Sequence, residues 1–238
     1  MGRDFRWLMS SSWIGNIGDG IALAAGPLLV ASQTRNALLV ALAAALQRLP
    51  TLLFGLVAGA IADRFDRRRV VVLADASRVV VVGALVVTLV TGSVSIGVVL
   101  GTMFLLGCAE MFADTASGAI LPMLVDRSDL GIGNARLMAG FLTANQLVGP
   151  PVGALLFAAG MAWPFVTQIV TLALALALIL RIRRPLRAER ETVYTHVRRD
   201  IAEGVRWLLS SPPVRTLALV ILAFNVTWGA AWSVLVLY

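Results

Sequence analysis

Seven long apolar runs, separated by short polar connections, constrain this 238-residue chain more than any other feature. A helix needs about twenty predominantly apolar residues to cross the hydrocarbon core of a bilayer. Hydrophobic residues make up 59% of the chain, charged residues 14%, and the mean hydropathy is +0.88, outside the usual range of soluble proteins. The sequence therefore predicts an all-α membrane protein. The predicted spans are 12–32, 38–62, 70–91, 94–116, 137–159, 163–180 and 216–238.

The arginines that separate these runs alternate in number from one connection to the next. They concentrate before the first run and after the second, fourth and sixth runs, whereas Arg35 alone stands on the opposite side. Because basic residues are enriched in cytoplasmic loops, this alternation predicts a plasma-membrane protein whose N-terminus is cytoplasmic. The arginines on that side are Arg3, Arg6, Arg64, Arg67, Arg68, Arg69, Arg127, Arg136 and nine residues between 181 and 215.

The net charge of +7 is accordingly interpreted as a topology signal and not as a nucleic-acid-binding surface. A cleavable signal peptide is the competing interpretation of the first run, because Arg3 and Arg6 precede it and small residues end it. Asn16 and Asp19 interrupt the apolar segment that such a peptide needs, and five further spans follow. We therefore favour a retained membrane span.

The composition becomes charged and polar between 181 and 215. Four apolar residues recur there at helical spacing with charged residues on the other faces, which predicts an amphipathic helix in the cytoplasmic interface. These four residues are Val197, Ile201, Val205 and Leu208. The Ser-Pro-Pro sequence at 211–213 is expected to end that helix before the seventh run begins.

Residues that carry enzymatic or metal chemistry are scarce. Cys108 is the only cysteine, which excludes a disulfide within the chain and a cysteine-type metal site. The single histidine, His196, stands in a basic polar stretch and is interpreted as a solvated loop residue. No spacing of Ser, His and Asp suggests a hydrolase. The sequence predicts a protein that is not an enzyme and that uses neither cofactor nor metal.

The sequence GAIADRFDRRR at 59–69 lies directly between the second and third runs. It resembles the signature loop between the second and third spans of the major facilitator superfamily of secondary transporters. Motifs at 16–20, 48–50 and 74–78 resemble the branch that contains bacterial siderophore exporters and related drug-efflux proteins. The exporter motif of that branch is similar to GPPVGA at 149–154, where Gly149, Pro150 and Gly153 match. Asn145 and Ala154 stand where that motif usually has glycine.

This resemblance implies a domain organisation and a mechanism. Residues 1–180 would form the six-helix N-terminal half of the fold, 181–215 a basic cytoplasmic linker, and 216–238 the start of a seventh span. The implied function is efflux of an amphipathic small molecule, such as a drug or siderophore, by alternating access with proton antiport. Complete members have twelve spans, so a C-terminal half or a second copy would be needed to complete the cavity. A fragment is favoured over a homodimeric half-transporter or a truncated, non-transporting remnant or scaffold.

Charged residues inside the predicted spans are the candidate binding residues, because charge in a bilayer is costly and usually functional. Asp19, Arg78 and Glu110 fall at similar depths, and the resemblance implies that the first and fourth spans line the central cavity. Carboxylates there can bind protons and a polar or cationic substrate group in turn. The structural alternative is that they pair with Arg78 or Arg48 and hold helices together. The predicted substrate and proton site comprises Asn16, Asp19, Arg48, Arg78 and Glu110.

Charges near the cytoplasmic face form a second candidate site. The resemblance implies that Asp63 and Arg67 belong to a latch that holds the outward-facing state, with Asp114 as the expected partner of Arg67. Interfacial charge pairs are weak enough to break and re-form in each cycle. The alternative is that the arginines only fix topology. The predicted latch comprises Gly59, Asp63, Arg64, Arg67, Arg68, Asp75 and Asp114.

Glycines four residues apart occur in three of the predicted spans, at 55 and 59, at 97 and 101, and at 149 and 153. This spacing predicts close approach of helix backbones. The Gly-Pro-Pro sequence at 149–151 removes two backbone donors and predicts a bend in the fifth span.

Overall fold

The structure is a computed structural model that describes residues 2–184, 186, 204 and 206–235. The chain divides into two compact units, Met1–Arg190 and Glu191–Tyr238, and each is described by itself. Every regular element in the described residues is helical, as the sequence predicted.

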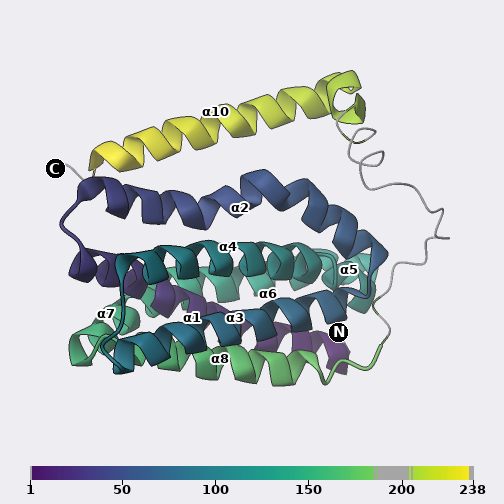
Figure 1. Cartoon of the computed structure of the whole chain (residues 1–238). Helices are drawn as coiled ribbons and strands as arrows, with labels where there is room; N and C mark the ends of the chain where they lie inside the picture. The colour runs from purple at the N-terminus through teal and green to yellow at the C-terminus, as the bar shows by residue number, and fades with distance from the viewer. Residues whose placement is uncertain (1, 185, 187–203, 205, 236–238) are drawn as a thin grey trace. The chain divides into compact units, whose positions relative to one another are not determined.

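Long helices lying side by side make up the first unit (Figure 1). In it α1 packs on α8 and α7, α4 packs on both α2 and α3, and α3 also contacts α8. The helices of this unit are α1 (Arg3–Gln33), α2 (Ala37–Arg64), α3 (Arg67–Val90), α4 (Ile96–Gly118), α5 (Leu121–Leu124), the 3₁₀ turn η1 (Arg127–Asp129), α6 (Leu130–Gly140), the π-helix η2 (Phe141–Val148), α7 (Gly149–Ala159) and α8 (Trp163–Ile179). The second unit contains α10 (Pro212–Leu235).

Short polar residues fix where three of these helices begin. The Asn36 side chain accepts a hydrogen bond from the backbone N–H of Leu38 at the start of α2, at 2.9 Å. Asp66 and Ser95 cap α3 and α4 in the same way. Each cap satisfies a backbone donor that has no partner within its helix, so the short connections between helices are encoded locally.

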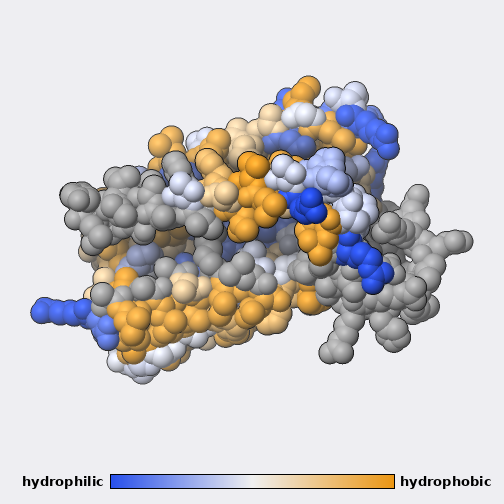
Figure 2. Space-filling model, turned by 90° about the horizontal axis from the view of Figure 1, so that it is seen from above, coloured by the Kyte–Doolittle hydropathy of each residue, from blue (hydrophilic) through white to orange (hydrophobic). Residues whose placement is uncertain are grey.

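Four helical segments of the described residues are long and apolar enough to cross a membrane, by length and composition. They are Arg3–Gln33, Arg67–Val90, Ile96–Leu124 and Arg127–Ala159. The other predicted runs also lie on helices, in shorter apolar stretches: Leu38–Gln47 and Leu53–Ala62 in α2, all of α8, and Pro212–Asn225 in α10. Exposed apolar side chains cover a long flank of the molecule, drawn orange in Figure 2. Such a surface suits contact with lipid.

The fifth predicted span is not one uniform helix. It begins in α6, passes through the π-helix Phe141–Val148 and continues as α7 from Gly149. Pro150 and Pro151 have no N–H to donate to the preceding turn, and the wider hydrogen-bonding pattern ends where these prolines begin. The span that was predicted to bend at the Gly-Pro-Pro sequence therefore contains a π-helical segment before the prolines. The bend itself stays a prediction.

The three glycine pairs behave differently from one another. A methyl group added at Gly149 would lie 2.5 Å from the Cα of Gly20, and one added at Gly153 would lie 2.3 Å from the carbonyl oxygen of Ile21. This pair lets α7 and α1 approach closely, as predicted. The prediction was wrong for the other two pairs among the described residues. Methyl groups at Gly55, Gly59 and Gly101 would meet nothing within 4 Å, and one at Gly97 would meet only Ser95, just before its own helix.

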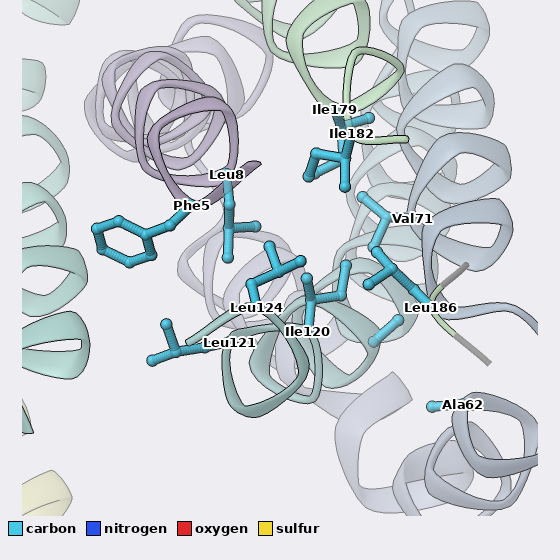
Figure 3. Close-up of a cluster of buried hydrophobic side chains, with 11 residues drawn as sticks. Phe5, Leu8, Ala62, Val71, Ile120, Leu121, Leu124, Ile179, Ile182 and Leu186 are labelled. Atoms are coloured by element: carbon cyan, nitrogen blue, oxygen red, sulfur yellow. The ribbon is translucent and has the colours of Figure 1, made fainter. Parts of the chain in front are cut away.

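Apolar side chains from the ends of several helices form one buried group, which we call the end cluster (Figure 3). Ile182 and Leu186, which follow α8, are fully buried in it. The backbone N–H of Arg67 donates to the carbonyl of Leu186 at 3.1 Å, and the Arg68 guanidinium donates to the carbonyl of Ile182. The members of the end cluster are Phe5, Leu8, Ala62, Val71, Ala116, Ile120, Leu121, Leu124, Ile179, Ile182 and Leu186.

The predicted interfacial helix of the linker lies largely outside the described residues, since these exclude Val197, Ile201 and Val205. Residues 206–210 are helical, Ser211 is not, and α10 starts at Pro212. The break therefore falls at the Ser-Pro-Pro sequence, where proline is well suited to the first turn of a new helix.

Candidate functional site

A cavity of about 750 Å³ lies within the first unit. Its walls come from α1, α3, α4, α6, η2 and α8, so residues far apart in sequence meet around one space. A volume of this size suits a small organic molecule. The charged and amide residues that line it are Asn16, Asp19, Asp75, Arg78, Glu110, Asp114, Asn134 and Asn145.

Arg78 is the centre of a buried ion network in the cavity wall. One terminal nitrogen of its guanidinium pairs with Asp19 on α1, and the other lies 3.2 Å from Asp75 Oδ1 on its own helix. The Arg78 side chain is only 6% exposed, and its Nε has no hydrogen-bond partner among the described residues. Because isolated charge is costly in this environment, the two carboxylates stabilise the guanidinium in the wall.

Helical spacing explains why these charges meet. Asp75 and Arg78 are three residues apart on α3 and therefore share one face of that helix. Asn16 precedes Asp19 by three residues on α1, and its side-chain nitrogen donates to the carbonyl of Ser12 at 2.8 Å and lies 3.3 Å from the Ser12 hydroxyl. The cavity-lining face of α1 therefore carries polar side chains at successive turns, from Ser12 through Asn16 to Asp19.

Two further carboxylates, Glu110 and Asp114, enter the cavity from α4, where they are one helical turn apart and exposed. Together with Asp19 and Asp75 they give four carboxylates against the single guanidinium of Arg78. This excess of negative charge favours binding of cationic groups and protons.

The cavity is lined by residues from both the predicted substrate and proton site and the predicted latch. Asn16, Asp19, Arg78 and Glu110 line it, as does Asp114 from the predicted latch. The main difference concerns Asp75, which was assigned to the latch at the cytoplasmic face. In the structure it lies in the cavity wall beside Arg78, because both residues project from the same face of α3.

Three of the remaining latch residues, Arg64, Arg67 and Arg68, lie at helix ends. The guanidinium of Arg67 donates to the carbonyl of Ala119 at 3.1 Å and lies 2.9 Å from the sulfur of Met123. It therefore joins the start of α3 to the end of α4. Arg64 ends α2, and Arg68 binds the segment after α8. The predictions for the side chains of Arg48 and Asp63 lie outside the described part of the chain.

Sequence reasoning missed one wall of the cavity. Four residues at spacings of four, three and four line it from α6 and η2, and they are Asn134, Met138, Phe141 and Asn145. Helical periodicity across the fifth run, with an amide at each end, could have indicated this face. Asn145 drew attention only because it departs from the exporter motif.

These features define a class of protein: a multi-pass helical membrane protein with a charged cavity lined by its helices. The chain belongs to the transmembrane secretion effector family of the major facilitator superfamily, whose sequence profile matches residues 2–238. Membership of this transporter family indicates a protein that is not an enzyme.

Two curated relatives are similar over most of the chain. The multidrug efflux pump Tap of Mycolicibacterium fortuitum is 31% identical over 210 residues, which cover 85% of this chain and 51% of the relative. The Tap pump of Mycobacterium tuberculosis is 30% identical over 230 residues, which cover 92% and 54%. The chain thus spans about half the length of the curated relatives it matches, and it is related to efflux pumps of the superfamily.

Proposed function

We propose that this chain forms the six-helix N-terminal half of a major facilitator transporter that exports an amphipathic small molecule in exchange for protons. A drug or a siderophore is the expected kind of substrate, and the name of the Tap relatives supports the former. The observation that carries the proposal is the network of Asp19, Arg78 and Asp75, because it keeps ionisable groups inside membrane helices at the wall of a ligand-sized cavity.

Proton exchange follows from the chemistry of this network. A proton on Asp19 removes its charge and weakens its pairing with Arg78, whereas a cationic substrate competes for the same carboxylate. Glu110 lines the same cavity and offers a second, more exposed acceptor. Competition between proton and substrate for one set of carboxylates is what an antiporter requires. The competing role for Asp19 is structural, and its pairing with Arg78 is the observation that favours that role.

Efflux driven by a pH gradient distinguishes the two roles. In cells that express the full product of the gene, Asp19→Asn should abolish gradient-driven efflux of a fluorescent drug, because the amide cannot exchange the proton. Glu110→Gln should weaken efflux or shift its pH dependence. An unchanged rate and pH profile in Asp19→Asn, at equal protein in the membrane, would make Asp19 a structural partner of Arg78 only.

The proposed organisation has six spans in residues 1–180, a cytoplasmic linker in 181–215 and a seventh span from 216, with the N-terminus on the cytoplasmic side of the plasma membrane. The arginine asymmetry supports this orientation. With Cys108 removed, a cysteine at Ser93 should react with an impermeant thiol reagent added to intact cells, and one at Ser128 should not. Both positions are exposed at helix ends, so they form a matched pair. Labelling at Ser128 alone would invert the topology.

The latch is the last part of the proposal. Its support is that Arg67 bonds to the end of α4, so that the signature loop can transmit a change at α3 to the helix that carries Glu110 and Asp114. Asp63→Asn should reduce efflux strongly and leave membrane insertion intact, because the arginines that set topology remain. Efflux at the parental rate would show that the loop only sets topology.

A further inference from the structure

We propose that Asn145 is a substrate-contacting residue that selects ligands carrying a hydrogen-bond acceptor near their cationic group. This inference rests on the proposed function and adds a specificity determinant to the same cavity. It starts from a residue that stands inside an apolar run and lines the cavity from η2.

The side chain of Asn145 has one hydrogen-bonding group left for a ligand. Its Oδ1 accepts a hydrogen bond from Nε2 of Gln146 at 2.7 Å. The Nδ2 group has no hydrogen-bond partner among the described residues, although Asn145 as a whole is 9% exposed. A buried amide that lines a cavity with an unused N–H pair can donate to an acceptor on a bound molecule.

The backbone holds Asn145 in this position. A methyl group added at Gly20 would lie 2.5 Å from the carbonyl oxygen of Asn145 and 2.8 Å from its Cα, so α1 and η2 are in direct backbone contact there. Gly149, at the end of the π-helix, contacts Gly20 as well. Gly20 follows Asp19 directly, and the contact therefore fixes the amide in register with the ion network. π-Helical segments occur frequently at functional sites.

The two sides of the cavity are chemically complementary. Four carboxylates project from α1, α3 and α4, and they recognise positive charge. Asn145 presents a neutral donor from η2, with Met138 and Phe141 as apolar neighbours on the same wall. A ligand that satisfies both sides has a cationic nitrogen and, a few atoms away, a carbonyl or ester oxygen. A cation without such an oxygen uses the carboxylates alone.

A pair of probes that differ only in the acceptor tests this inference on the purified full product of the gene. The probes are radiolabelled hexanoylcholine, which has an ester carbonyl, and an alkyltrimethylammonium of equal chain length, which has none. The variants are Asn145→Leu, which keeps the volume and removes the donor, and Thr143→Val, an exposed control in the same π-helix that does not line the cavity. Equilibrium binding of both probes is measured for each protein.

The parent should bind both probes. Asn145→Leu should lower the affinity for hexanoylcholine about tenfold, which corresponds to the loss of one hydrogen bond to a buried group. Its affinity for the alkyltrimethylammonium should stay within about twofold of the parent's. Thr143→Val should change neither. If Asn145→Leu does not fold, Asn145→Asp replaces it. The ratio of its affinity for hexanoylcholine to its affinity for the alkyltrimethylammonium should fall, because the amide donor is lost. A parent that binds neither probe overturns the proposed function and this inference together. A parent that binds both, with an unchanged ratio in the Asn145 variants, overturns this inference alone.

Discussion

The charged cavity wall and the end cluster are built on the same helices but from opposite kinds of residue. On α1, Phe5 and Leu8 belong to the end cluster, and Asp19 follows three turns later in the wall. On α3, Val71 belongs to the cluster and Arg78 to the ion network two turns on. Leu8 and Val71 also line the cavity, so on each helix the apolar packing region adjoins the charged one directly.

The energetics of the two regions differ accordingly. Burying one Ile or Phe side chain away from water contributes about 1.5–3 kcal/mol, so the end cluster is a source of stability. A buried ion pair contributes little net stability, because desolvation offsets the attraction, yet removal of one partner is strongly destabilising. The comparison indicates that the end cluster holds the helices together, while the wall retains its charges for a purpose other than stability.

The most direct way to break this comparison is Arg78→Met. The substitution leaves Asp19 and Asp75 without their common counter-charge, and loss of one partner from a buried network costs about 3–5 kcal/mol. Thermal unfolding of the purified chain measures the loss, and Arg69→Met, an exposed arginine on the same helix, is the matched control with an expected change within about 0.5 kcal/mol. Equal stability of the two variants would mean that the network carries no buried charge.

A second variant tests the close packing of α7 against α1, the helix that carries Asp19. Gly153→Ala places a methyl group 2.3 Å from the carbonyl oxygen of Ile21, and overpacking of this kind costs about 1–3 kcal/mol. Gly101→Ala is the control, because its methyl group meets nothing within 4 Å among the described residues. The control should be neutral or more stable by up to about 1 kcal/mol, as expected for alanine in a helix. A reversed order of melting temperatures would refute the close contact of α1 and α7.

The smallest expected effect comes from a substitution in the end cluster. Ile182→Val removes one methyl group from the end cluster and should cost about 0.5–1.5 kcal/mol. Binding of the alkyltrimethylammonium probe should stay within about twofold, because Ile182 does not itself line the cavity. Leu180→Val, at an exposed neighbouring position, is the control and should change neither quantity. A clear loss of probe binding in Ile182→Val alone would show that the end cluster also shapes the site.

Several features of the site were predictable because they depend on position along a helix. The rise of 1.5 Å per residue gives the depth of a side chain from sequence alone, and it placed Asp19, Arg78 and Glu110 in one layer. The structure does bring all three to one cavity. The choice between Arg78 and Arg48 as the partner of Asp19 was not predictable, because it depends on how α1 and α3 are rotated against each other.

The glycines illustrate the same limit. Three pairs have identical spacing in the sequence, but only Gly149 and Gly153 lie against another helix backbone within 3 Å. Spacing shows that two glycines share a face of a helix and does not show what that face contacts. Asn145 shows the same limit. The sequence places it in an apolar run, but only the structure shows that it lines the cavity.

The sequence by itself determined that this chain is a helical membrane protein, roughly where its helices lie, and which charges are at membrane depth, because these follow from local hydropathy, capping and the helical rise. The tertiary structure alone decided that Arg78 pairs with Asp19 and Asp75, that Asp75 belongs to the cavity, and that η2 presents Asn145 beside Gly20. Those outcomes depend on the rotation and packing of helices from distant parts of the chain, and no local pattern encodes them.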